Sequence, residues 1–130
     1  ITLLFDKKYD TPILVRADEK KIEQVLMNLL ENAIKYGKTK GQTIVNIKNQ
    51  SSNKLMISIK DDGEGIQPQH VSRIFERFYR VDQSRSRDQG GSGLGLSIVK
   101  HIIEAHDQEV LAESEYGKGS TFSFTLKKLK

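Results

Sequence analysis

The sequence predicts an α+β fold, a two-layer α/β sandwich in which about three helices cover one face of a mixed β-sheet. The chain has 130 residues, enough for one domain with a buried core and too few for two, so residues 1–130 form one predicted domain. Apolar residues make up 36% and charged residues 29%, the balance of a globular domain. The elements come in the order strands, helix, hairpin, loop, helix, hairpin, which favours helices layered on a mixed sheet over a regular parallel fold.

The chain opens with extended segments, followed by a long helix. Residues 1–5 are apolar, residues 13–15 are β-prone and Pro12 excludes a helix interior, so we expect two short strands. From Asp18, a suitable N-cap, apolar residues recur at helical spacing until the helix ends near Gly37. Those apolar positions are Ile22, Val25, Leu26, Leu29, Leu30 and Ala33.

Two hairpins and a second helix complete the predicted framework. Residues 44–47 and 55–59 read as strands joined by a polar turn. A second pair of strands, at residues 109–114 and 121–126, flanks a glycine-containing turn. Between the two hairpins, apolar residues at helical spacing predict a helix over about residues 94–105.

A long segment without hydrophobic periodicity precedes that helix. Pro68 marks the start of a helix before this segment. Residues 77–93 are polar and arginine-rich, and a loop this long inside a compact domain is usually functional. Phe75 and Phe78, three residues apart, could anchor its near end. Loop arginines could bring positive charge over a terminal phosphate, with solvated side chains as the alternative. These arginines are Arg80, Arg85 and Arg87.

Several classes of protein and site are excluded by composition. The absence of cysteine excludes disulfides, a thiolate nucleophile and thiolate metal sites. The net charge of +4 is spread along the chain, and we expect no nucleic-acid partner. No stretch approaches the roughly 18 apolar residues of a membrane span, and the start at Ile1 inside an apolar run suggests a fragment of a longer protein. The histidines His70, His101 and His106 form no metal-ligand pattern, and none lies in a phosphoacceptor-like sequence.

A polar stripe on the first helix could bind a metal–nucleotide complex. Asn28, Asn32 and Lys35 are spaced i, i+4 and i+7, which places them on one side of a helix. Amide oxygens can ligate Mg²⁺, and a lysine ammonium can reach phosphate oxygens. The alternative interpretation is an ordinary solvated face.

A carboxylate followed by glycines ends the strand at residues 55–59. Asp61 lies at the strand end, while Gly63 and Gly65 allow a tight turn or the close approach of a ligand. Because a carboxylate offers only hydrogen-bond acceptors, Asp61 could bind the exocyclic amine of adenine and discriminate against a ring carbonyl. A plain Asp-Gly turn is the alternative.

A second glycine cluster opens the second helix. Gly91, Gly93 and Gly95 precede or begin it, and such glycines leave N–H groups directed at an anion. The dinucleotide-binding motif does not fit, because its last glycine position is taken by Leu96, and the chain contains no P-loop motif. A flexible linker is the alternative.

Taken in order, four motifs resemble the asparagine, first glycine, phenylalanine and second glycine boxes of sensor histidine kinases of two-component systems. The likeness covers nearly the whole chain and looks closest to the phosphate-regulon sensors. The four motifs are NLLENAIKY at 28–36, DDGEGI at 61–66, IFERFYR at 74–80 and GSGLGL at 91–96.

The resemblance implies the Bergerat ATP-binding fold shared with gyrase, heat-shock-90 and mismatch-repair ATPases, with ATP between the first helix and a long mobile lid. It implies ATP and Mg²⁺ as cofactors, and as partners a dimerisation and histidine phosphotransfer domain outside this chain and a response regulator reached through the phosphohistidine. The parent would be a bacterial membrane protein with this domain in the cytoplasm. The fragment is expected to be monomeric and not to autophosphorylate.

Residue roles follow from the same resemblance. Asn32, assisted by Asn28, would hold Mg²⁺, while Lys35 and Tyr36 would meet the phosphate and ribose side and Asp61 the adenine amine. Asn28, Lys35 and Arg80 would be the catalytic residues, with Arg80 at the γ-phosphate. The remaining implied contacts are Gly63, Gly65 and Ile66 at adenine, Phe75 and Phe78 in the phenylalanine box, and Gly91, Ser92, Gly93, Leu94, Gly95 and Leu96 at the lid hinge and phosphates.

Departures from related families refine the expected function. Related ATPases carry a water-activating glutamate four residues before the metal-binding asparagine, and here that position is Asn28, so ATP hydrolysis should be poor. Asp62 replaces the family's usual asparagine, and Asp107-Gln108 replaces its usual glycine pair, but neither has a metal or adenine role.

Two other hypotheses stay open. A degenerate nucleotide-binding scaffold is disfavoured by the intact Asn32, Asp61 and lid glycines. A related ATPase or an anti-sigma serine kinase is disfavoured by the phenylalanine box and by Asn28.

Overall fold

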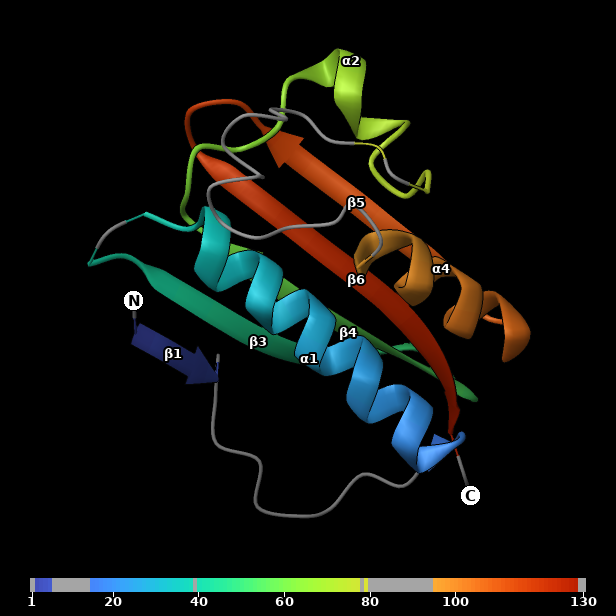
Figure 1. Cartoon of the computed structure of the whole chain (residues 1–130). Coiled ribbons are helices and arrows are strands. Elements are labelled where there is room, and N and C mark those ends of the chain that lie inside the picture. The colour runs from blue at the N-terminus through green and yellow to red at the C-terminus, as the bar shows by residue number, and fades with distance from the viewer. Residues whose placement is uncertain (1, 6–14, 39, 78, 80–94, 129–130) are drawn as a thin grey trace.

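The computed structural model describes residues 2–5, 15–38, 40–77, 79 and 95–128. Two layers are visible in Figure 1, with helices α1 and α4 lying across one face of a β-sheet. The short helix α2 lies near β5. In chain order the elements are β1 (Thr2–Phe5), β2 (Val15–Arg16), α1 (Glu19–Tyr36), β3 (Gln42–Ser51), β4 (Lys54–Asp61), α2 (Pro68–Val71), α4 (Gly95–Ala105), β5 (Val110–Glu115) and β6 (Gly119–Lys128).

The sheet is mixed, as the sequence predicts. Strands β1, β3, β4 and β6 follow one another across it, and β2 and β5 both pair with β6. Strand β1 runs parallel to β3, whereas the other pairs are antiparallel. Strands β3 and β4 form the first predicted hairpin, and β5 and β6 form the second.

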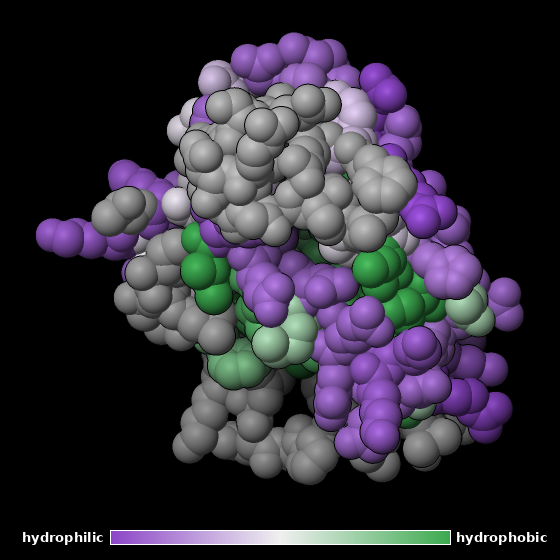
Figure 2. All heavy atoms as spheres, viewed as in Figure 1, coloured by the Kyte–Doolittle hydropathy of each residue, from purple (hydrophilic) through white to green (hydrophobic). Residues whose placement is uncertain are grey.

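The core lies between the helices and the sheet. Val25, Leu29 and Ala33 recur along α1 and are buried, because the apolar stripe of an amphipathic helix must face the sheet. Helix α4 buries Val99, Ile102 and Ile103 in the same way. The outer side of the helical layer is mostly hydrophilic, with separate rather than continuous apolar patches (Figure 2). The sheet contributes Leu55, Ile57, Ile59, Phe122, Phe124 and Leu126 to this core.

The start of α1 is tied to the end of α4 by a histidine. Asp18 caps α1, where its Oδ1 accepts a hydrogen bond from the backbone N–H of Lys21 at 3.1 Å. The backbone N–H of Asp18 donates to Nε2 of His106 at 3.0 Å, and the Nδ1 of that ring lies 2.8 Å from the carbonyl oxygen of Ile102. The ring of His106 thus links the start of α1 to the end of α4, and this contact gives it a structural role. No helix in the described ranges is long and apolar enough to cross a membrane.

Helix α4 ends in a Schellman motif at Asp107-Gln108, and this motif explains why a glycine pair is usual at this place in the family. The N–H of Gln108 donates to the carbonyl of Ile103 at 3.1 Å, and the N–H of Asp107 donates to that of Glu104 at 2.9 Å. Asp107 then takes the left-handed position of the motif with φ 58°. Glycine reaches that conformation without steric cost, whereas an L-residue is strained there.

Replacing Asp107 with glycine is therefore expected to stabilise the domain by about 1 kcal/mol. Urea unfolding of Asp107→Gly beside Asp107→Ala measures the effect, because alanine removes the same side chain but keeps the steric cost of positive φ. Equal stabilities for the two variants would contradict this explanation.

Candidate functional site

A buried carboxylate lies where β4 ends. Asp61 is the last residue of β4 and is only 4% exposed, and its Oδ1 accepts a hydrogen bond from the N–H of Gly63 at 2.9 Å. Burial raises the pKa of Asp61, while hydrogen bonds from the backbone of Gly63 and Ser120 act in the opposite direction and the charge of Asp62 adds to the rise. Ionised Asp61 is an acceptor-only group in a poorly solvated place, which suits recognition of a donor such as an amine.

Gly63 brings the end of α1 next to this carboxylate. A Cβ on Gly63 would lie 2.2 Å from the carbonyl oxygen of Tyr36, so only glycine fits against the last turn of α1. The same added atom would lie 3.1 Å from Oδ1 of Asp61. The predicted adenine-binding turn and the C-terminal end of the predicted metal-binding helix therefore touch.

The polar stripe of α1 is partly buried, and at Asn28 it contacts the start of α4. Asn28, Asn32 and Lys35 are all partly buried. The Nδ2 of Asn28 donates to the carbonyl of Gly95, the first residue of α4, at 3.4 Å. The ammonium of Lys35 lies 6.0 Å from the ring centroid of Tyr36. The stripe thus connects the start of α4 to the last turn of α1, next to Gly63.

The loop after Asp61 rests on the β5–β6 hairpin. Gly65 has φ +80°, and a Cβ there would lie 2.4 Å from the carbonyl oxygen of Glu115. The N–H of Ile66 donates to Oγ of Ser114 at 2.7 Å, and the N–H of Gly117 donates to the carbonyl of Glu64 at 2.6 Å. These contacts fix the loop that carries Gly63 and Gly65.

Sequence reasoning gave no site role to the hairpin residues that support the loop. Gly119 has φ +137°, and a Cβ on it would lie 2.1 Å from the carbonyl oxygen of Asp61. The hydroxyl of Ser114 also donates to the carbonyl of Gly119 at 3.0 Å. The only sequence signal was a pair of glycines, Gly117 and Gly119, in a predicted turn, and such a turn is common without any ligand.

The phenylalanine box is attached to the core at its described end. The ring of Phe75 meets that of Phe122 edge-on, with centroids 6.1 Å apart and planes at 88°, and the neighbouring Ile74 is 5% exposed. Arg73 and Glu76 form an exposed ion pair at 3.0 Å, which lowers the pKa of Glu76. The packing of Phe75 agrees with the predicted anchoring of the loop.

Part of the predicted site lies outside the described residues. Of the second glycine box, Gly95 and Leu96 are described. A Cβ on Gly95 would meet nothing within 4 Å, and Leu96 packs partly buried against the core. The predicted residues outside the described ranges are Phe78, Arg80, Arg85, Arg87, Gly91, Ser92, Gly93 and Leu94.

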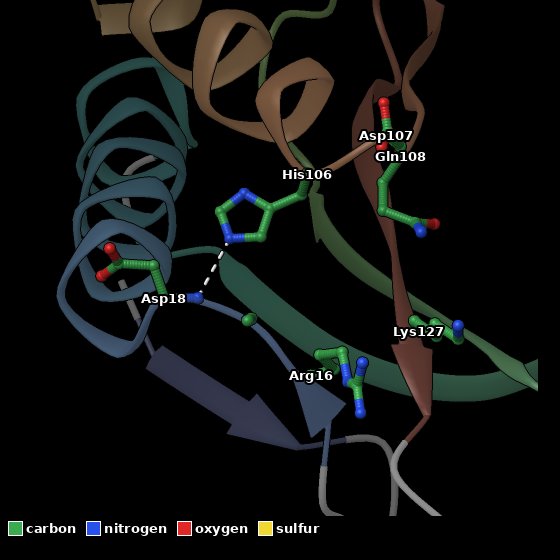
Figure 3. Close-up of a pocket in the computed structure, with 7 residues that line it drawn as sticks. Arg16, Asp18, His106, Asp107, Gln108 and Lys127 are labelled. Carbon is green, nitrogen blue, oxygen red and sulfur yellow. Dashed lines mark hydrogen bonds between the residues drawn. The ribbon is translucent and has the colours of Figure 1, made fainter.

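A separate pocket opens at the other end of α1, about 27 Å along the helix from Tyr36 at 1.5 Å per residue. Its volume is about 570 Å³, and the His106 ring reaches across it to the backbone of Asp18 (Figure 3). None of the predicted nucleotide or metal ligands lines it. The lining residues are Arg16, Ala17, Asp18, His106, Asp107, Gln108 and Lys127.

Comparisons with known proteins identify the family of this chain. Residues 17–130 match the family described as "Histidine kinase-, DNA gyrase B-, and HSP90-like ATPase". The chain is 45% identical over 118 residues to the sensor histidine kinase WalK of Bacillus subtilis (strain 168), covering 90% of this chain and 19% of WalK. This chain therefore spans about a fifth of that relative's length.

Two solved structures share the fold. The mycobacterial sensor histidine kinase MprB superposes with a TM-score of 0.79 at 27% identity, covering 98% of this chain and 80% of MprB. The catalytic domain of histidine kinase ThkA gives a TM-score of 0.78 at 30% identity, covering 98% and 78%. The chain therefore belongs to the histidine kinase-, DNA gyrase B- and HSP90-like ATPase family, in which it is an ATP-binding catalytic domain of the sensor histidine kinase type.

Proposed function

We propose that this domain binds Mg²⁺-ATP beside α1 and presents the γ-phosphoryl group to a histidine on a separate dimerisation domain, as the kinase module of a two-component sensor. The observation that carries the proposal is the buried Asp61 carboxylate, held by the N–H of Gly63 directly against the end of α1. Adenine recognition is then assigned to the end of β4 and the turn after it, and phosphate binding to the adjoining helix α1.

Adenine selection is assigned to Asp61. Its ionised carboxylate can accept a hydrogen bond from the exocyclic amine of adenine, whereas guanine would bring a carbonyl oxygen to the same place. Because burial already disfavours the charge of Asp61, a bound donor relieves part of that cost. Gly63, Gly65 and Ile66 would line the adenine side.

Mg²⁺ and the phosphates are assigned to the stripe on α1. The side chains fit Mg²⁺ as ligands, because Asn28 and Asn32 offer neutral amide oxygens. Mg²⁺ takes most of its remaining ligands from phosphates and water. Asn28 already donates its amide N–H to Gly95, which orients the side chain between the two helices. Lys35 would add a point charge at the phosphates, and Tyr36 would meet the ribose side. When bound, Mg²⁺ would neutralise charge on the phosphate oxygens.

Phosphoryl transfer to a protein side chain is favoured over hydrolysis. Asn28 occupies the position at which related ATPases have a catalytic glutamate, and an amide cannot act as a general base. The acceptor histidine would belong to another domain, because none of the three histidines lies in a phosphoacceptor-like sequence. In addition, His106 is engaged at both ring nitrogens and His70 contacts the hydroxyl of Tyr79. Arg80 is assigned to the γ-phosphate by its place in the phenylalanine box.

The properties of the whole protein are proposals of the same kind. We infer a parent that carries the dimerisation and histidine domain, passes the phosphoryl group to a response regulator and is anchored in a bacterial membrane with this domain in the cytoplasm. The isolated domain is expected to be a monomer. The finer likeness to phosphate-regulon sensors remains a prediction.

Calorimetric titration with ADP, with and without Mg²⁺, tests the metal assignment. Mg²⁺ is expected to tighten ADP binding to the unaltered domain, and Asn32→Ala is expected to weaken Mg²⁺-ADP binding by about 10- to 100-fold by removing a metal ligand. Asn53→Ala, in the turn between β3 and β4, is the matched control and should bind normally. An Asn32→Ala variant that keeps full Mg²⁺ dependence would overturn the assignment.

A further inference from the structure

A buried threonine stands beside Asp61 on the neighbouring strand. Thr43 of β3 is 1% exposed and is paired in register with Asp61 of β4, which in turn pairs with Ser120 of β6. Two residues further along, Val45 pairs with Ile59 in the core, and side chains two apart on a strand share a face. Thr43, Asp61 and Ser120 therefore form one row on the helix-covered face.

The hydroxyl of Thr43 has no hydrogen-bond partner within the described part of the chain. Other buried hydroxyls on the sheet are satisfied. Oγ of Ser120 lies 2.9 Å from Oγ of Ser114, and Oγ1 of Thr125 accepts from the N–H of Glu109 at 3.0 Å and donates to Oε1 of Gln108 at 2.8 Å. A buried hydroxyl without a partner is costly and rare, so the exception at Thr43 requires an explanation.

The position of Thr43 relative to Asp61 is fixed by Asp62. Both carboxylate oxygens of Asp62 lie 3.1 Å from the N–H of Gln42, the residue before Thr43. A Cβ on Gly41 would lie 2.2 Å from Oδ1 of Asp62, so the chain approaches this carboxylate as closely as glycine allows. Asp62 thus links the start of β3 to the end of β4.

We propose that Thr43 is a positioning residue for Asp61, and that its hydroxyl donates to the Asp61 carboxylate when an adenine nucleotide is bound. Directly opposed residues on antiparallel strands have Cβ atoms only about 5 Å apart, within reach of a hydroxyl–carboxylate hydrogen bond. An ionised carboxylate has about four acceptor positions, so it can serve Gly63, Thr43 and the adenine amine together. This role rests on the proposed nucleotide site and adds a residue that sets its affinity and its preference for a 6-amino purine.

The decisive variant is Thr43→Val, which replaces the hydroxyl with a methyl group of similar size. Its ADP affinity is expected to fall about fivefold, the loss of one hydrogen bond. The melting temperature of the nucleotide-free domain should stay the same or rise, because no existing bond among the described residues is broken. Thr43→Ser should restore ADP affinity to within about twofold, and Thr43→Ala repeats the comparison if valine does not fold.

Thr125→Val is the matched control, because it makes the same change at a buried threonine whose hydrogen bonds are already made. It should lower the melting temperature and leave ADP affinity unchanged. Purine riboside diphosphate lacks the 6-amino group. It therefore distinguishes a role of Thr43 in positioning Asp61 from a role of Thr43 in packing alone. The Thr43→Val penalty should be smaller for this analogue than for ADP.

Two failures are distinguishable by calorimetry. If the unaltered domain binds no ADP, the proposed nucleotide function fails and the role of Thr43 fails with it. If the unaltered domain binds ADP and Thr43→Val binds it equally well, or loses affinity equally for ADP and for purine riboside diphosphate, only the role of Thr43 is overturned.

Discussion

Asp61→Asn is expected to weaken ADP binding by about 30-fold or more while leaving the nucleotide-free domain at least as stable at neutral pH. The variant replaces a charged acceptor with an amide whose NH₂ group can face the adenine amine, donor against donor, and a hydrogen bond to a charged group contributes about 1.5–3 kcal/mol. The Oδ1 of asparagine can still accept from Gly63. Binding and folding should therefore respond in opposite directions.

The stability effect of this substitution depends on pH with a definite sign. Burial raises the folded-state pKa of Asp61 above its ordinary value of 3.8. The stability linked to the protonated acid is therefore fully present below that ordinary value and is lost as the pH rises through the folded-state pKa. Asparagine carries no charge at any pH, so its advantage should appear above the folded-state pKa and vanish in acid.

Asp62→Asn is the matched control for Asp61→Asn. It also removes one negative charge, but its remaining carbonyl oxygen can still accept from the N–H of Gln42, so ADP affinity should change little. Calorimetric titrations and thermal melts of both variants measure the difference. Tight ADP binding by Asp61→Asn would show that the adenine pocket has been misplaced.

Among the substitutions considered, Gly119→Ala should lower the free energy of unfolding most, by about 3 kcal/mol or more. An added Cβ would lie 2.1 Å from the carbonyl oxygen of Asp61 and 3.0 Å from Cα of Asp62, so strands β4 and β6 would have to separate. These are backbone atoms and cannot rotate away. Because the displaced residue is Asp61, nucleotide binding should weaken as well.

Gly117→Ala separates this clash from the cost of positive φ. Gly117 has φ +91°, but a Cβ there would meet nothing within 4 Å, so the expected loss is about 1 kcal/mol. Urea unfolding of the two variants gives both values. Similar losses would mean that backbone conformation, and not contact with Asp61, makes glycine necessary at position 119.

The framework of the fold could be predicted because its signals are local. The Asp18 cap marked the start of α1, the apolar period marked its length, and Gly37 marked its end. The β-prone segments marked both hairpins. Strand lengths were underestimated, because polar residues at the ends of β3 pair with β4 beyond the apolar run at 44–47. The left-handed conformation of Asp107 was not predicted either, because it depends on the residue at which α4 ends.

The candidate site was only partly predictable from the sequence. Asp61 was identifiable as a carboxylate at a strand end, and the structure shows that it is also buried. The roles of Thr43 and Gly119 depend on cross-strand register, and that of Gly63 on the approach of α1, none of which is written in local sequence. The assigned functions of Asn28, Asn32 and Lys35 stay predictions, as do those of the lid residues outside the described ranges.

The most direct test of the proposed function is phosphoryl transfer to the histidine-bearing dimerisation domain of the parent protein. The domain, that partner, Mg²⁺ and ATP labelled at the γ-phosphate are incubated together, and the label on the partner is tested for acid lability. We expect acid-labile phosphate on the partner, none on the isolated domain, and much less on the partner when Asp61→Asn replaces the unaltered domain at an ATP concentration that does not saturate the variant. Tight ADP binding without any labelled partner would contradict the kinase assignment and favour a nucleotide-binding scaffold.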